Sequence, residues 1–90
     1  MRLGDAIREG CKIYPNQAFR QYYNDEDVAA CAMGAAQAGA KAGGYTIDGL
    51  ADPTVCPECS RLASLDGIVV HINDIHLWTR ERIADWADTL

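Results

Sequence analysis

Small and apolar residues near the amino terminus recur at the spacing of an amphipathic helix. They stand at intervals of three and four residues: Leu3, Ala6, Ile7 and Gly10. This spacing places all four on one helix face, with the charged residues between them facing water. Pro15 lacks a backbone N–H and clashes with a preceding helical turn. The pattern therefore predicts a first helix over residues 4–12.

A second helix is predicted in the middle of the chain. Asn24 is a good capping residue, and three carboxylates follow it in the turn where the helix dipole favours negative charge. The expected inward stripe is almost entirely small: Val28, Cys31, Ala32, Ala35, Ala36 and Gly39. The helix should run to about Lys41, with Gly43 and Gly44 ending it. We expect its small-residue face to let another helix approach closely.

Three aromatic residues are closely spaced just before the second helix: Phe19, Tyr22 and Tyr23. Their spacing suits one or two helical turns that pack onto the core. We favour this interpretation because aromatic side chains are usually buried. The alternative is that the tyrosine pair forms a binding surface.

The chain is less regular after the second helix. Residues 45–55 contain Asp-Gly and Asp-Pro turn signals, so we expect an irregular connector there. Residues 62–75 fit either a helix or a strand by their apolar spacing. We favour the helix, because no second strand is evident with which a strand could pair.

The last helix is marked more clearly. Thr79 is a good N-cap, and Trp78 and Ile83 stand at the two positions of a hydrophobic staple. The expected buried stripe of this helix is Ile83, Trp86, Ala87 and Leu90. Residues 1–90 are thus predicted to form one compact, mainly α-helical domain of about four helices.

Composition and charge restrict the class of partner. The net charge of −5 disfavours electrostatic binding to nucleic-acid phosphates, because such binding needs clustered Lys and Arg. A basic protein partner is more compatible with this charge. The carboxylates expected to face that partner are Asp25, Glu26, Asp27, Asp48, Asp52, Asp85 and Asp88. No apolar run approaches the ~20 residues of a membrane span. The charged amino terminus lacks the apolar segment of a signal peptide, so we expect a cytoplasmic protein.

The most specific chemistry lies in residues 56–76. Cys56 and Cys59 form a C-P-x-C turn, and His71 and His76 follow. Thiolate sulfur and imidazole nitrogen are the donors of small tetrahedral zinc sites, so this spacing predicts one zinc ion in a zinc-knuckle loop. Positions five apart diverge by about 140° in an ideal helix, so one histidine has to lie past a helix end.

Other interpretations of these residues stay open. The two cysteines could be free thiols or a redox pair, and the histidines could serve only as hydrogen-bonding groups. Asn73 and Asp74 suit hydrogen bonds to the backbone of the turn before Thr79. Cys31 supplies an enzyme alternative, as the nucleophile of a hydrolase or transferase with His71 as its base. A zinc-stabilised nucleic-acid regulator is a third hypothesis.

Five segments form a combined pattern: AIREG, CAMGAA, CPEC, VHINDIH and WTRERIADW. Together they resemble a group of small uncharacterised proteins from phages, prophages and bacteria, whose pattern runs CALGA, CPxC and HLNDxHxW(T/S)RExIADW. Met33 and Ile72 stand where that group usually has leucine. The resemblance implies a phage or mobile-element setting, in which small acidic proteins often bind and block host machinery. We therefore expect an interaction protein, not an enzyme, that inhibits a bacterial defence complex.

Overall fold

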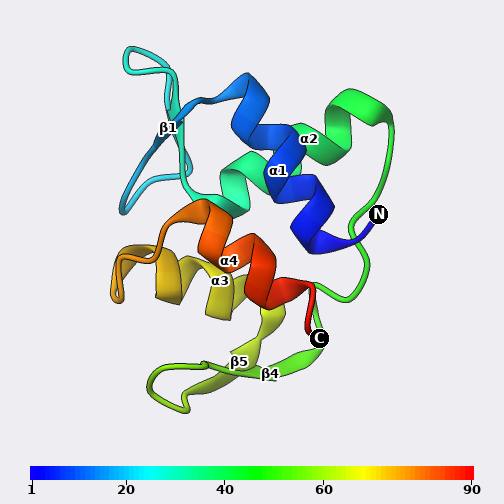
Figure 1. Ribbon diagram of the computed structural model, residues 1–90, viewed down its shortest axis with the longest axis vertical. Coiled ribbons are helices and arrows are strands. Elements are labelled where there is room, and N and C mark those ends of the chain that lie inside the picture. Colours follow the sequence, from blue (N-terminus) through cyan, green and yellow to red (C-terminus); the bar gives the residue numbers. More distant parts are fainter.

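Four helices make up most of the computed structural model, which describes all 90 residues (Figure 1). The helices are α1 (Leu3–Ile13), α2 (Ala32–Gly43), α3 (Leu65–Asp74) and α4 (Arg80–Ala87). The strands are β1 (Asn16–Gln17), β2 (Tyr23–Asn24), β3 (Ala29–Ala30), β4 (Pro53–Val55) and β5 (Leu62–Ser64). In one sheet β3 lies between β1 and β2, whereas β4 and β5 form a separate hairpin. The mainly helical fold is confirmed, and none of its helices has the length and apolar character of a membrane span.

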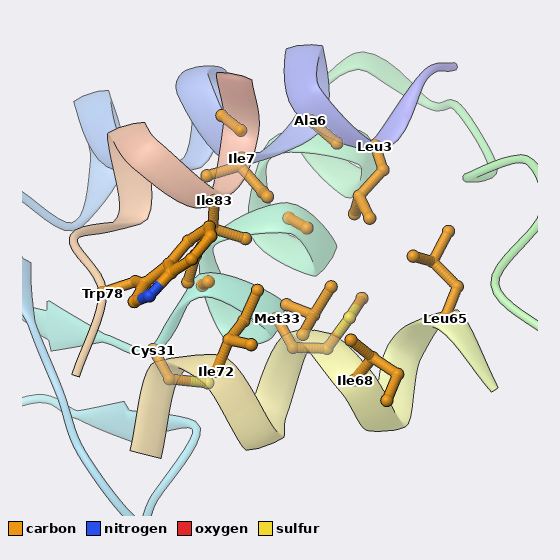
Figure 2. Packing of buried hydrophobic residues seen from close by; sticks show 14 of the residues in the cluster. Leu3, Ala6, Ile7, Cys31, Met33, Leu65, Ile68, Ile72, Trp78 and Ile83 are labelled. Atoms are coloured by element: carbon orange, nitrogen blue, oxygen red, sulfur yellow. The ribbon is translucent and has the colours of Figure 1, made fainter. Parts of the chain in front are cut away.

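Side chains from all four helices meet in one hydrophobic core (Figure 2). Its largest fully buried members are Ile7 from α1, Met33 from α2, Ile68 and Ile72 from α3, and Ile83 from α4. In Figure 2 the ribbon of α2 lies between that of α1 and that of α3. The small residues of α2 are thus enclosed on two sides, which explains why so few large side chains suffice.

α1 and α2 pack at very short range because glycine lies at their crossing. A Cβ atom at Gly10 would stand 1.7 Å from the carbonyl oxygen of Ala35. One at Gly39 would stand 2.2 Å from the carbonyl oxygen of Ala6. Only glycine leaves room for a neighbouring backbone this close, so the expected close approach of a second helix to α2 is confirmed.

Replacing Gly10 by alanine is expected to destabilise the protein by about 2–3 kcal/mol, because the methyl group would force the two helices apart. Gly67 is the matched control, since it is also helical but exposed on α3. A Cβ there would meet no heavy atom closer than Ser64 Oγ at 3.3 Å. Gly67→Ala should instead raise stability by up to about 1 kcal/mol through helix propensity. Urea unfolding measures both changes in stability. Equal unfolding midpoints for the two variants would contradict the close packing of α1 against α2 at Gly10.

The helix predicted from Asn24 begins only at Ala32, so that part of the prediction is wrong. Residues 25–28 form a turn between β2 and β3. The side chain of Asn24 accepts a hydrogen bond from the N–H of Asp27 at 3.3 Å, and therefore caps this turn instead of a helix. Val28 has a φ of 49°, which a right-handed helix does not contain.

The aromatic residues of this region do not join the core, contrary to the prediction. Phe19, Tyr22 and Tyr23 are 43%, 46% and 38% exposed. They lie on the segment that joins β1 to β3, drawn in cyan at the upper left of Figure 1, where it extends away from the helices. Because this segment is not helical, residues three and four apart no longer share one face. Tyr23 is still anchored, since its hydroxyl donates to the carbonyl of Gly34 at 3.0 Å.

Residues 62–75 contain a short strand followed by a helix, so the preferred helix is correct for Leu65–Asp74 and wrong for Leu62–Ser64. β5 pairs antiparallel with β4, opposite to our preference for a helix over the whole stretch, and α3 follows directly. The partner strand lies in the stretch predicted to be irregular, so that expectation is also corrected. Figure 1 shows the β4–β5 hairpin extending from the helices, with residues 56–61 at its tip.

The start of α4 is as predicted. Thr79 accepts a hydrogen bond from the N–H of Arg82 at 3.1 Å, and Trp78 and Ile83 are both buried. The predicted buried stripe holds only in part, because Leu90 is exposed and lies beyond the end of the helix.

Candidate metal centre

Cys56 and Cys59 lie on the turn at the tip of the β4–β5 hairpin. The N–H of Cys56 donates to the carbonyl of Arg61 at 2.8 Å, and the N–H of Ser60 donates to the carbonyl of Cys56 at 3.1 Å. The N–H of Glu58 donates to Cys56 Sγ at 3.4 Å, which fixes the position of this sulfur within the turn. Ser60 has a φ of 63°, the left-handed conformation that glycine adopts most readily. The turn therefore closes as a knuckle without glycine after its second cysteine.

The two histidines come from the carboxyl end of α3. His71 lies in the last turn of this helix, whereas His76 lies beyond the helix end at Asp74. The chain then changes direction at Leu77, which has a φ of 56°. The two imidazole rings meet edge to face, with their centroids 4.8 Å apart. The expectation that one histidine lies past a helix end is confirmed.

All four predicted ligands converge on one point. One ligand atom from each of Cys56, Cys59, His71 and His76 lies within 4.8 Å of the other three. His71 Nε2 is 3.2 Å from Cys59 Sγ and 3.1 Å from His76 Nε2. Cys56 is buried, the histidines are half-buried and Cys59 is exposed. These residues lie close enough together to hold a metal ion.

The surroundings of the histidines favour metal binding. Burial, then the neighbouring His76 and Arg61, lower the pKa of His71, which keeps its imidazole in the neutral form that a metal requires. Oε2 of Glu58 lies 3.6 Å from Nδ1 of His76, and it also accepts a hydrogen bond from the indole of Trp78 at 2.5 Å. A carboxylate beside the second nitrogen is typical of histidine ligands. No role was predicted for Glu58, although its place between the two cysteines is a signal for one.

Cys31 stands at the N-cap of α2, not two turns inside a helix as predicted. Its Sγ accepts a hydrogen bond from the N–H of Gly34 at 3.3 Å. Burial raises the pKa of this thiol, which disfavours the thiolate that a nucleophile needs. His71 meanwhile faces Cys59 and His76. The cysteine and histidine of the enzyme alternative are therefore not joined by a hydrogen bond.

Asn73 and Asp74 have a structural role, but their partners are not the predicted turn before α4. Asn73 is fully buried, accepts a hydrogen bond from the N–H of Ala32 at 3.0 Å and donates one to the carbonyl of Ala18 at 3.1 Å. Asp74 accepts one from the N–H of Arg20 at 2.9 Å. The two residues thus tie the end of α3 to the start of α2 and to the segment after β1.

The carboxylates predicted to face a partner occupy several parts of the structure. Asp85 and Asp88 bind Arg8 at 2.8 and 2.7 Å, and the hydrogen bond from Arg8 lowers the pKa of Asp88. These two residues therefore join α4 to α1. Asp48 lies 3.3 Å from the terminal amine, and Asp52 is exposed before β4. The other three lie together on the turn between β2 and β3.

Arg80 is a buried residue for which no role was predicted. It is 7% exposed, and its guanidinium donates to the carbonyls of Tyr14, Pro15 and Ala30. These partners lie at least 50 positions away in the chain. Local sequence therefore carries no signal for this contact.

Comparison with protein-family models, with curated proteins and with solved structures found no match. What the protein does is therefore inferred from the geometry of its own residues.

Proposed function

We propose that this protein is a zinc-stabilised interaction protein that binds a basic protein partner. The observation that carries the binding role is the exposed group of aromatic and acidic side chains between Phe19 and Val28. The four converging ligand atoms support the zinc site.

Zinc suits the four ligands better than the other common metals. Two thiolates and two imidazoles form a soft donor set, whereas calcium and magnesium prefer oxygen. In a tetrahedral site with zinc–ligand bonds of about 2.0–2.3 Å, the ligand atoms stand roughly 3.3–3.8 Å apart. The observed separations of 3.1 and 3.2 Å are close to that range, and none exceeds 4.8 Å.

A zinc ion held by these residues would serve the structure. A two-stranded hairpin is marginally stable by itself in water. Two of the four ligands come from the tip of the β4–β5 hairpin and two from the end of α3, so a shared ion fastens the hairpin to the helices. Four protein ligands complete a tetrahedral site and leave no position for a substrate.

The segment from Phe19 to Val28, which we name the acidic–aromatic loop, is suited to a cationic partner. Phe19, Tyr22 and Val28 are each more than 40% exposed, and the turn at residues 25–28 carries three exposed carboxylates. None of these carboxylates forms an ion pair within the protein. Lys and Arg side chains can bind carboxylates and aromatic faces at the same time. A basic surface therefore matches both features of the loop.

The partner class that we propose is a nucleic-acid-binding complex of a bacterial defence system. Its basic groove would accept the acidic–aromatic loop in place of nucleic acid. The resemblance to phage-encoded proteins supports this class, and we propose the host cytoplasm as the site of the encounter. The net charge of −5 supports a protein that binds such a groove over one that binds nucleic acid itself.

Charge reversal in the acidic–aromatic loop is expected to weaken binding to such a complex. A triple variant in which lysine replaces Asp25, Glu26 and Asp27 should lose more than about tenfold in affinity for the complex at low salt. The reason is that its new positive charges repel the basic surface of the partner. The control variant Asp48→Lys, Asp52→Lys should lose less than about threefold, since its carboxylates lie outside the loop. Binding of tagged protein to purified defence complexes, with their own nucleic acid as competitor, measures both.

Two outcomes would contradict this function. Binding that responds neither to salt nor to the loop charges would remove the electrostatic basis of the proposal. Steeply salt-dependent binding of DNA or RNA by the protein alone would favour a nucleic-acid regulator.

A further inference from the structure

Glu58 lies in the middle of the ligand turn and contacts three parts of the site. Its N–H donates to Cys56 Sγ at 3.4 Å. Its Oε2 lies 3.6 Å from Nδ1 of His76 and accepts the hydrogen bond of Trp78 Nε1 at 2.5 Å. No other carboxylate of the chain forms an ion pair with a residue of the four-ligand cluster. One side chain therefore links the ligand turn, a ligand histidine and a tryptophan.

The carboxylate of Glu58 faces Nδ1 of His76 at 3.6 Å, a close contact that is longer than a hydrogen bond. A neutral imidazole carries a proton on one nitrogen and a lone pair on the other. A carboxylate only accepts, so Glu58 favours the proton on Nδ1 and leaves the lone pair on Nε2. Nε2 is the atom that faces His71, at 3.1 Å from Nε2 of that residue. Glu58 thus orients His76 toward the other ligands.

The contact with Trp78 extends the site to the hydrophobic core. Trp78 belongs to the core cluster and directly precedes the N-cap of α4. Its ring belongs to the same core cluster as Ile83, both labelled in Figure 2, and its backbone N–H donates to the carbonyl of Ile72 at 3.1 Å. Oε2 of Glu58 therefore contacts both His76, a proposed ligand, and Trp78, the first residue of the hydrophobic staple of α4.

We propose that Glu58 is a positioning residue that makes zinc binding and the placement of Trp78 depend on each other. The proposal rests on the zinc site proposed above. A displacement of the hairpin tip moves Glu58 away from His76 and Trp78 together, because both contacts use Oε2. Zinc binding then stabilises the start of α4, although no residue of α4 is a ligand.

The test uses the full chain with Trp86→Phe, which leaves Trp78 as its only tryptophan. Glu58→Gln is compared in this background with Glu26→Gln, the same chemical change at an exposed carboxylate outside the site. Zinc affinity is measured by competition with a chelator of known affinity. Glu58→Gln should weaken zinc binding by about 10- to 100-fold, and Glu26→Gln should change it by less than about twofold.

A spectroscopic readout separates positioning from a general loss of stability. With Glu58 present, zinc addition should change the fluorescence of Trp78, and nitrogen NMR of the zinc-free protein should show His76 protonated at Nδ1. In Glu58→Ala the fluorescence change should be lost at saturating zinc, and the zinc-free protein should no longer show one single protonation form of His76. Urea unfolding of the zinc-free proteins serves as the control, and the parent and Glu58→Gln should unfold at the same midpoint.

Each part of the proposal can fail separately. Equal zinc affinity in the parent and in Glu58→Gln would overturn the positioning role and leave the zinc site intact. A Trp78 signal that follows zinc equally in Glu58→Ala would overturn the coupling. A parent protein that binds no zinc would overturn the zinc site itself, and this proposal with it.

Discussion

If the proposed site at Cys56, Cys59, His71 and His76 holds zinc, removing the ion is expected to lower stability by about 4 kcal/mol. This value applies where free zinc stands about 1000-fold above its dissociation constant. For a chain of this length the corresponding fall in Tm is roughly 20 °C. The physical reason is that the ligand pairs come from separate elements, a hairpin tip and the end of α3, and meet only in the folded protein. Calorimetry with and without EDTA measures the change.

Cysteine variants test whether this loss arises at the proposed site. Cys59→Ser should reproduce the effect of EDTA and should no longer respond to EDTA. Cys11→Ser is the matched control, because Cys11 is a free cysteine on α1 outside the ligand cluster, and this variant should keep the full response. Hydrogen exchange should show that chelation exposes the amides of residues 53–64 and spares those of α1 and α2. A Tm that EDTA does not change would contradict a stabilising ion.

The parts of the fold that were predicted correctly depend on local features. α1 follows from its apolar spacing, and α2 ends at Gly43, with Gly44 as a C-cap whose φ of 73° suits glycine. Thr79 marks the start of α4 because an N-cap acts within one helical turn. The convergence of the four Cys and His residues was predictable because the chain has only two histidines, and both follow a C-P-x-C turn.

The parts that were not predicted depend on contacts between distant segments. Residues 25–31 carry a good helix-start sequence, yet β3 pairs with both β1 and β2 and holds the chain extended. The segment Leu62–Ser64 is a strand because β4 lies beside it. Intrinsic propensity differs by less than about 1 kcal/mol between ordinary residues, so such pairing outweighs it. Phe19, Tyr22 and Tyr23 are exposed for the same reason. They lie on the segment between β1 and β3, which strand pairing keeps from forming a helix.

Replacing Asn73 by alanine is expected to destabilise the protein by about 4 kcal/mol, since each buried polar group left without a partner contributes about 1–3 kcal/mol. Its Oδ1 accepts hydrogen bonds from the N–H of Ala32 at 3.0 Å and from Gln17 Nε2 at 2.8 Å. Its Nδ2 donates to the carbonyl of Ala18 at 3.1 Å. Ala32 is the first residue of α2, and its N–H has no acceptor within the helix. Urea unfolding measures the loss.

Asn24→Ala is the control, and it decides what determines where α2 begins. Asn24 is the helix start that local sequence indicates, but its side chain bonds only Asp27 within an exposed turn. Its replacement should lower stability by no more than about 1 kcal/mol. A larger loss from Asn24→Ala than from Asn73→Ala would mean that local sequence, and not the residue on α3, sets the start of α2.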